Sequence, residues 1–191
     1  MDIERERSLV EQAKSDVQAF GLLYDAYYSQ IYAYCLKRTA SVSAAQDVTS
    51  EVFFNALKSI RQFRWRGVPF SAWLYRIAMH EISNYYRSNG HRRVSLEELA
   101  NFDIPDEEQA EAQTKLERQQ DFLAVRAVVA RLPEKYREVV MLRFFDHLQL
   151  NEISQVLGKS EGTVKSLLHR GLEKLRALVA QDATFPRPDG L

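Results

Sequence analysis

Residues 148–176 read LQLNEISQVLGKSEGTVKSLLHRGLEKLR, and this stretch holds the strongest local signal in the sequence. Apolar residues recur at helical spacing before and after Gly158, and this glycine ends the first of two predicted helices. Ser160 is well placed to cap the start of the second helix. A short helix, a three-residue turn and a second helix have the spacing of a helix-turn-helix, in which the second helix lies in the DNA major groove. The alternative interpretation is an ordinary helical hairpin with a solvated charged face.

The second predicted helix of this pair is amphipathic. Its apolar residues begin at Val164, continue to Leu175 and fix the side that packs inward. The other side presents basic and hydroxyl side chains, which can bond to guanine acceptors or to phosphates. The residues that we expect to contact DNA in the major groove are Ser160, Thr163, Lys165, Ser166, His169, Arg170 and Lys174.

Helical periodicity covers most of the remaining chain. Only 7 of the 191 residues are Gly and 5 are Pro, which favours helix over sheet. Gly67 and Pro69 predict an irregular loop over residues 64–69. The helices expected from the spacing of apolar residues cover about residues 20–38, 48–60, 70–88, 122–132, 134–145, 150–157 and 161–178. The predicted fold class is therefore all-α, with two small helical domains.

Charge is distributed unevenly along the chain, although its 26 Lys and Arg residues are balanced by 26 Asp and Glu residues. Residues 58–93 hold eight Lys or Arg and one Glu, whereas residues 94–120 hold two basic and eight acidic residues. An acidic segment with few apolar residues cannot form a core, so it predicts an extended or partly disordered linker. We expect a domain over residues 1–93, the acidic linker over 94–119, a helix-turn-helix domain over 120–180 and a disordered tail over 181–191.

A basic and aromatic block at residues 61–93 is the second signal for nucleic acid. Arginines alternate there with Phe, Trp and Tyr residues. Positive charge follows a phosphate backbone while exposed rings stack on unpaired bases, so the composition suits single-stranded DNA. The alternative is that most rings belong to the core, and we expect burial or partial burial for Phe70, Trp73 and Tyr85, which follow the helix period. Trp65 lies among arginines in the predicted loop and is the better candidate for a base contact.

Three stretches of the sequence resemble one protein family. They are DVTSEVFFNALKSIRQF from Asp47, PFSAWLYRIAMHEISNYYRS from Pro69, and LPEKYREVVMLRFFDHLQLNEISQVLGKSEGTVKSLLHRGLEKLR from Leu132. Together and in this order they are similar to the extracytoplasmic-function (ECF) subfamily of bacterial sigma factors. The resemblance covers both predicted domains. It implies a factor that binds core RNA polymerase, recognises two promoter elements and promotes strand opening for transcription initiation.

The resemblance also assigns roles to particular residues. It implies that the clamp helices of the largest polymerase subunit dock on the helix bearing Asp47, Val48, Glu51 and Phe54, and that the polymerase flap is a further contact. The loop 64–69 and the helix after it resemble the part that opens the upstream promoter element and captures a flipped base of the non-template strand. The residues in this group are Arg64, Trp65, Arg66, Trp73, Arg76, Asn84 and Arg87, with Arg92 and Arg93 near duplex phosphates.

Further implications of the resemblance concern the second domain, the linker and a regulator. Lys165, Ser166, His169 and Arg170 match the positions that read the more distant promoter element. The acidic linker would thread toward the polymerase active-site cleft. Many members of the family are held inactive by an anti-sigma protein, which is therefore a further expected partner.

Three places depart from the family pattern. His80 stands where the family usually has Asn. Leu167 and Leu168 are apolar where many members have a basic or polar residue at one of the two positions. Gly171 replaces the commoner Ala. These departures bear on which promoter sequences are preferred and leave the class unchanged.

Composition argues against several other classes of protein. The single cysteine, Cys35, cannot form a disulfide within the chain, and its apolar surroundings are typical of a small buried hydrophobic residue. The four histidines lack the spacing of metal ligands, and no Gly-rich phosphate loop occurs, so we expect no metal, no cofactor and no catalysis. The sequence shows neither a signal peptide nor a membrane span, which predicts a cytoplasmic protein without direct membrane insertion.

Three hypotheses about function remain open at this point. The first is a sigma factor that acts only with polymerase. The second is a stand-alone repressor or activator that dimerises and binds a palindromic site through residues 148–176. The third is a protein-interaction adaptor whose basic block binds an acidic partner. The sigma hypothesis is favoured because it alone uses both the arginine-flanked aromatics and the helix-turn-helix.

Overall fold

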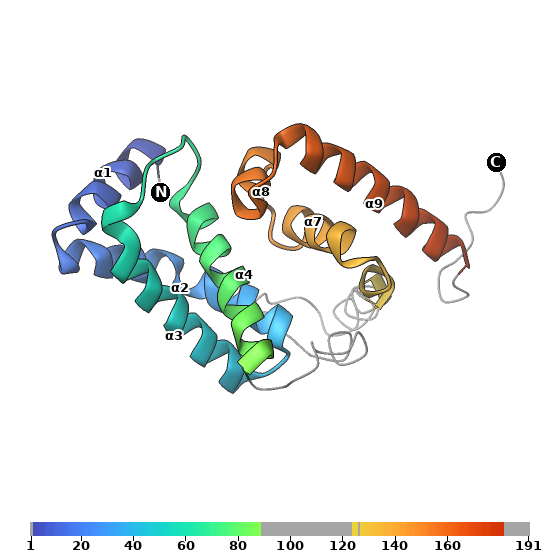
Figure 1. Ribbon diagram of the computed structural model, residues 1–191, viewed down its shortest axis with the longest axis horizontal. Coiled ribbons are helices and arrows are strands. Elements are labelled where there is room, and N and C mark those ends of the chain that lie inside the picture. The colour runs from blue at the N-terminus through green and yellow to red at the C-terminus, as the bar shows by residue number, and fades with distance from the viewer. Residues whose placement is uncertain (1, 89–123, 126, 182–191) are drawn as a thin grey trace, which may run out of the picture. The chain divides into compact units, whose positions relative to one another are not determined.

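The computed structural model describes residues 2–88, 124–125 and 127–181, and every regular element within these ranges is helical (Figure 1). The predicted all-α class is confirmed. The predicted acidic linker lies outside the described residues, and so does the predicted disordered tail apart from Gln181, which ends the last helix. None of the described helices is both long enough and apolar enough to span a lipid bilayer.

Contacts between Cα atoms group the helices into two compact units. One unit contains the first four α-helices, a short 3-10 helix and α8. These elements are α1 (Ile3–Ala13), α2 (Val17–Thr39), α3 (Val42–Ser59), η1 (Ile60–Gln62), α4 (Phe70–Ser88) and α8 (Leu150–Leu157). The other unit contains α7 (Glu134–Phe144) and α9 (Glu161–Gln181). The domain boundaries expected from the sequence stay predictions.

The core of the first unit comes from the amphipathic helices that the sequence predicts. Ile31 and Tyr34 of α2, Val52 of α3, and Leu74 and Tyr75 of α4 are all at most 1% exposed. Two helices begin earlier than expected because side chains cap them. The Asp16 carboxylate accepts from the backbone N–H of Gln18 before α2, and Ser41 Oγ accepts from the N–H of Ala44 in the first turn of α3.

Cys35 is buried in this core, as the sequence predicts. Its side chain has no exposed surface. Burial raises the pKa of its thiol to about 11, with smaller opposing contributions from Thr49 and Arg38. A thiol with this pKa is almost entirely protonated at neutral pH, and reactive cysteines are thiolates. Cys35 is therefore a packing residue.

Helix α1 is not among the elements predicted from the sequence. Its buried residues are Glu6, Val10 and Ala13, spaced four and three positions apart as one face of a helix requires. The first of the three is a glutamate, which an analysis of apolar spacing counts as exposed. The apolar pattern is therefore incomplete, and the helix was missed.

The packing of α9 against α7 is close at Gly171. A Cβ atom placed there would lie 3.2 Å from Val140 Cγ2 and 3.4 Å from Tyr136 Cβ. Around this contact, Val129, Leu132 and Val140 form a buried cluster, with five partly buried residues packed on it. These five are Met141, Phe145, Leu168, Leu175 and Leu178. Glycine at 171 therefore lets the two helices approach, which gives a physical reason for the departure noted in the sequence.

We predict that Gly171→Val lowers the free energy of unfolding by about 1–3 kcal/mol, because two further methyl groups beyond Cβ overpack the contact with α7. Gly162→Val is the matched control, since nothing lies within 4 Å of a Cβ at that exposed position of the same helix. Urea titrations followed by circular dichroism measure both changes. Equal stability of the two variants would contradict the close packing at Gly171.

Candidate nucleic-acid and polymerase interfaces

An aromatic cluster holds the loop between η1 and α4. The Phe63 ring lies 5.4 Å from that of Phe70 and 5.0 Å from that of Trp73, measured between centroids. Trp65, further along the loop, meets Phe63 edge-on at 6.3 Å. Gly67 takes a left-handed φ of 73° at the tip of the loop, which glycine adopts at little cost. The rings therefore fix the base of the loop, while its arginines stay free of the core.

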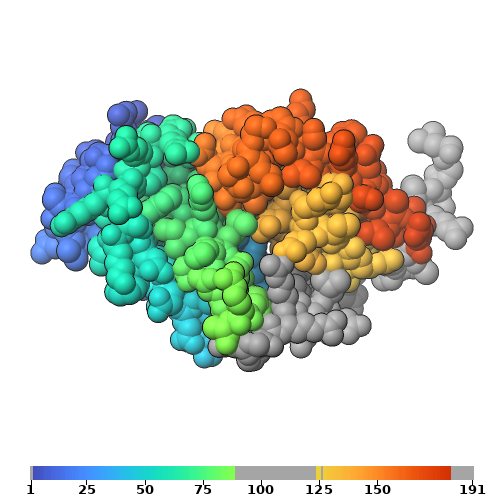
Figure 2. Space-filling view, in the orientation of Figure 1, coloured from blue at the N-terminus to red at the C-terminus, as the bar shows by residue number. Residues whose placement is uncertain are grey.

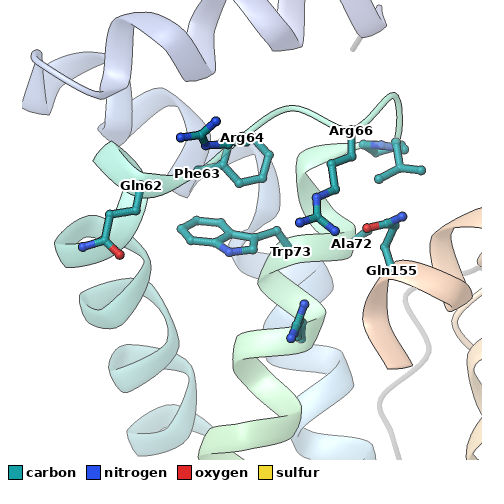
Figure 3. Close-up of a pocket in the computed structure, with 10 residues that line it drawn as sticks. Gln62, Phe63, Arg64, Arg66, Ala72, Trp73 and Gln155 are labelled. Atoms are coloured by element: carbon teal, nitrogen blue, oxygen red, sulfur yellow. The ribbon is translucent and has the colours of Figure 1, made fainter. Parts of the chain in front are cut away.

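A hollow beside this loop is basic and aromatic. On the side of the loop and α4 it is lined by Gln62, Phe63, Arg64, Arg66, Val68, Pro69, Ala72, Trp73 and Arg76. Figure 3 shows the Trp73 ring beside Phe63 and the Arg66 side chain reaching from the loop toward α4 near Ala72. Guanidinium groups next to a partly buried ring suit a nucleotide, because they can bond phosphate while the ring stacks on a base.

The residues expected to contact the opened promoter element differ in exposure. Four arginines are exposed, namely Arg64, Arg66, Arg76 and Arg87. Trp65, Trp73 and Asn84 are partly buried, and Asn84 Nδ2 donates to Glu81 Oε2 at 3.2 Å. Phe70 is fully buried and Tyr85 is partly buried, as expected from the helix period. Arg92 and Arg93 lie outside the described residues.

One face of α3 exposes an acidic and aromatic set. Asp47 and Glu51 are exposed, and the Phe54 side chain is 51% exposed although it is aromatic. Lys58 Nζ lies 4.1 Å from the centre of the Phe54 ring. Residues 47, 51, 54 and 58 share one side of the helix, since they are three or four positions apart. Part of the surface of α3, drawn in cyan to teal, is visible in Figure 2.

Val48 belongs to the core instead of this surface. It is 3% exposed, because it follows the buried positions of α3 that face the other helices. The sequence resemblance groups Val48 with Asp47, Glu51 and Phe54 as a polymerase contact. The structure leaves its side chain almost no accessible surface, so we omit Val48 from the contact residues proposed below.

The turn between α8 and α9 has the length that the sequence predicts. Gly158 ends α8 in the left-handed region at φ 62°, and its N–H donates to the Ser154 carbonyl. The Lys159 N–H also donates to that carbonyl, at 3.0 Å. At the start of α9, Ser160 Oγ accepts from the Thr163 N–H at 3.2 Å, so Ser160 is the expected N-cap. The turn of residues 158–160 is confirmed.

The outward face of α9 carries most of the predicted major-groove residues. Lys165, Ser166, His169 and Arg170 are all exposed. His169 Nδ1 lies 3.6 Å from Glu173 Oε2, which places an acidic residue in the middle of this face. Glu173 is not among the contacts expected from the sequence. Its four-residue spacing from His169 is the signal that could have identified it.

Of the other three predicted residues, two cap α9 and the third lies at the flank of its outward face. Ser160 and Thr163 join through their hydroxyl oxygens at 2.8 Å and cap the helix. Lys174 is exposed, but its Nζ lies 5.8 Å from the centre of the Tyr136 ring of α7. Lys174 therefore lies at the flank of the face. Leu167 and Leu168 are partly buried, which explains why these two positions are apolar here.

Comparison with known proteins decides the family. Residues 23–92 match the sigma-70 region 2 family, and residues 122–175 match the sigma-70 region 4 family. The ECF RNA polymerase sigma factor BldN of Streptomyces coelicolor is 35% identical over 184 residues, which cover 95% of this chain and 69% of that protein. The chain belongs to the ECF sigma factors. The sigma factor SigW of Bacillus subtilis is 30% identical, with 92% of this chain and 97% of that protein covered.

Solved structures agree with this assignment. This sigma factor is similar to CnrH, whose structure was solved in complex with the cytosolic domain of CnrY. The TM-score is 0.66 at 26% identity, and the match covers 93% of this chain and 99% of CnrH. A second similar structure is the sigma factor RpoE, in a co-crystal structure with the anti-sigma factor NepR from Bartonella quintana. Its TM-score is 0.59 at 19% identity, and the match covers 85% of this chain and 98% of that one. This likeness shows a shared fold. As a family member, the chain functions in promoter recognition and transcription initiation by RNA polymerase. This family consists of regulators of initiation, which as a class are not enzymes.

Proposed function

We propose that the first part of this sigma factor binds polymerase and opens the DNA strands, and that the second part reads duplex DNA. The observation that carries the proposal is the joint match to region 2 and region 4 in a single chain. A stand-alone repressor needs only the second of these, and an adaptor needs neither. The chain itself catalyses no reaction and needs no cofactor, because the chemistry of RNA synthesis belongs to the polymerase.

The polymerase-binding surface is the exposed face of α3. Phe54 is half-exposed there, beside the carboxylates of Asp47 and Glu51. A large exposed ring with charged neighbours is typical of an interface anchor, whose burial supplies much of the binding energy. We assign this face to the clamp helices of the largest polymerase subunit, with the flap as a further contact of the chain.

The strand-opening surface is the loop between η1 and α4 with the adjacent face of α4. Its members are Arg64, Trp65, Arg66, Trp73, Arg76, Asn84 and Arg87, with Arg92 and Arg93 continuing the basic run. Aromatic–base stacking contributes about 1–3 kcal/mol per base, which is comparable to the cost of unstacking one base from a duplex. The exposed arginines would hold the phosphates on either side of a captured base.

The duplex-reading surface is the outward face of α9. Arg170 and Lys165 can bond guanine acceptors in the major groove, and Ser166 and His169 supply further polar contacts. Ser160 and Thr163 lie at the helix N-terminus, where a backbone N–H can meet a phosphate. Lys174, at the flank, would contact the DNA backbone instead of a base. Backbone contacts fix the register, and base contacts carry the sequence information.

We also infer that an anti-sigma protein regulates this chain. Support comes from CnrH, whose solved structure is a complex with the cytosolic domain of CnrY. The site of action would be the bacterial cytoplasm, where the chromosome and polymerase are found.

Run-off transcription with core bacterial polymerase on a library of genomic fragments tests the proposed function. We expect transcripts with defined start sites when the protein is added to core polymerase, and none from core polymerase alone. The protein alone should bind promoter duplex weakly. Tight, sequence-specific binding by the protein alone at physiological salt would favour the stand-alone regulator instead.

A further inference from the structure

Glu6 of α1 is a buried charged residue that no proposed contact uses. It is 3% exposed, and among the described residues it is the only Asp, Glu, Lys or Arg in the buried class. A carboxylate removed from water is costly unless hydrogen bonds replace its hydration. Glu6 also precedes the segment that matches region 2, which begins at residue 23.

Both hydrogen bonds of Glu6 Oε1 lead to other helices. The Tyr27 hydroxyl of α2 donates to it at 2.5 Å. The backbone N–H of Phe70 donates to it at 2.6 Å, across 64 positions of sequence. Burial and the bond to Glu6 both raise the pKa of Tyr27 above its usual value, so the hydroxyl keeps its proton and donates.

Phe70 is the first residue of α4, and this position gives the second bond its importance. The first N–H groups of an α-helix have no partner within the helix. The residue before Phe70 is Pro69, whose side chain cannot accept a hydrogen bond, so α4 has no capping side chain at its own N-cap position. A carboxylate also suits this place because the helix dipole is positive at its N-terminus. Glu6 therefore supplies the cap of α4 from a distant helix.

The capped residue is also the end of the strand-opening loop. Arg64, Trp65 and Arg66 lie four to six positions before Phe70. The Phe70 ring packs against Phe63, at the start of the loop, and against Trp73. Any movement of the first turn of α4 would thus move both ends of the loop.

We propose that Glu6 is a positioning residue for promoter opening, which fixes the first turn of α4 and with it the loop that carries Trp65. This inference rests on the proposed role of the loop. Glu6 itself touches no DNA, because it is buried. It sets the geometry in which the arginines and Trp65 meet the opened strand.

The test compares Glu6→Ala with Glu6→Gln, each with core polymerase. Glutamine keeps an oxygen that can accept from both Tyr27 and Phe70, whereas alanine leaves the N–H of Phe70 without its cap. We expect Glu6→Ala to lower initiation on a duplex promoter by about tenfold, the factor that corresponds to a lost cap. On a template already mismatched around the start, we expect initiation to fall by less than about threefold. Glu6→Gln should restore most of the duplex activity.

Two controls separate positioning from a general loss of fold. Glu4→Ala removes an exposed glutamate of the same helix turn and should behave as the unchanged protein. The chain has only two tryptophans, at 65 and 73, so acrylamide quenching of their fluorescence reports on this region alone. Quenching should increase in Glu6→Ala and return to normal in Glu6→Gln, while helical circular dichroism is unchanged in both.

The outcomes distinguish this inference from the proposed function. Equal losses on duplex and mismatched templates, or unchanged quenching in Glu6→Ala, would overturn the role of Glu6. Should Glu6→Ala fail to fold, Tyr27→Phe serves instead: it removes one of the two bonds, and a duplex-specific loss smaller than about tenfold is expected. If the unchanged protein supports no initiation with polymerase, the proposed function itself is wrong.

Discussion

Replacing Trp65 by alanine is expected to lower initiation on duplex promoters by at least about tenfold, and initiation on templates mismatched around the start by far less. The physical reason is that stacking of one base on an aromatic ring is worth about 1–3 kcal/mol, which must offset the unpairing of that base. A mismatched template needs no such compensation. Run-off transcription on paired duplex and mismatched templates of the same sequence measures the ratio.

The control for this result is Trp65→Phe, which keeps a ring at the same place. It should retain most of the duplex activity, because every base can stack on any aromatic face. Trp65 is only partly buried and meets Phe63 edge-on, so its loss should leave the fold of the first unit intact. Equal losses on both templates would show that Trp65 stabilises the protein or binds polymerase instead.

Arg170→Ala is expected to relax the preference for the more distant promoter element. A bidentate arginine contact to guanine discriminates against the wrong base by about 1–3 kcal/mol, so preference at one base position should fall by about tenfold or more. Binding to core polymerase should not change, because Arg170 lies on the outward face of α9. Transcription from promoters randomised at the more distant element, followed by sequencing of the transcripts, measures the preference position by position.

Arg176→Ala provides the matched control on the same helix. Arg176 is exposed as well, but it lies nearly two helical turns further from the N-terminal end that enters the groove. Its removal should leave base preference unchanged. A loss of polymerase binding in Arg170→Ala would place this residue in a protein interface and would contradict its assignment to DNA.

Local signals in the sequence are sufficient to predict the two helices and the turn of the helix-turn-helix. A glycine at 158 and a serine at 160 act within three or four residues of their own positions, through the left-handed C-cap and the N-cap. The periodicity of α2, α3 and α4 was equally clear, because each buries a long apolar face. Elements of this kind can be predicted without knowledge of the tertiary structure.

Features that depend on contacts between distant segments could not be predicted. The buried carboxylate of Glu6 accepts hydrogen bonds from Tyr27 and from the N–H of Phe70, and neither partner is near it in sequence. Val48 was grouped with exposed neighbours, since a resemblance transfers positions and not their exposure. In the sequence, Gly171 is only a departure from the commoner Ala of the family, and its close approach to Val140 is evident only in the packed structure.

Site-specific cross-linking in one initiation complex tests the division of work most directly. A photo-reactive amino acid would replace Gln62, at the side of the loop, in one variant and Ser166, on the outward face of α9, in another. On a fully duplex promoter with core polymerase, we predict that position 62 cross-links to an unpaired base of the non-template strand, and position 166 to paired DNA upstream. Cross-links from position 62 to paired upstream DNA, or from position 166 to the unpaired strand, would contradict the account.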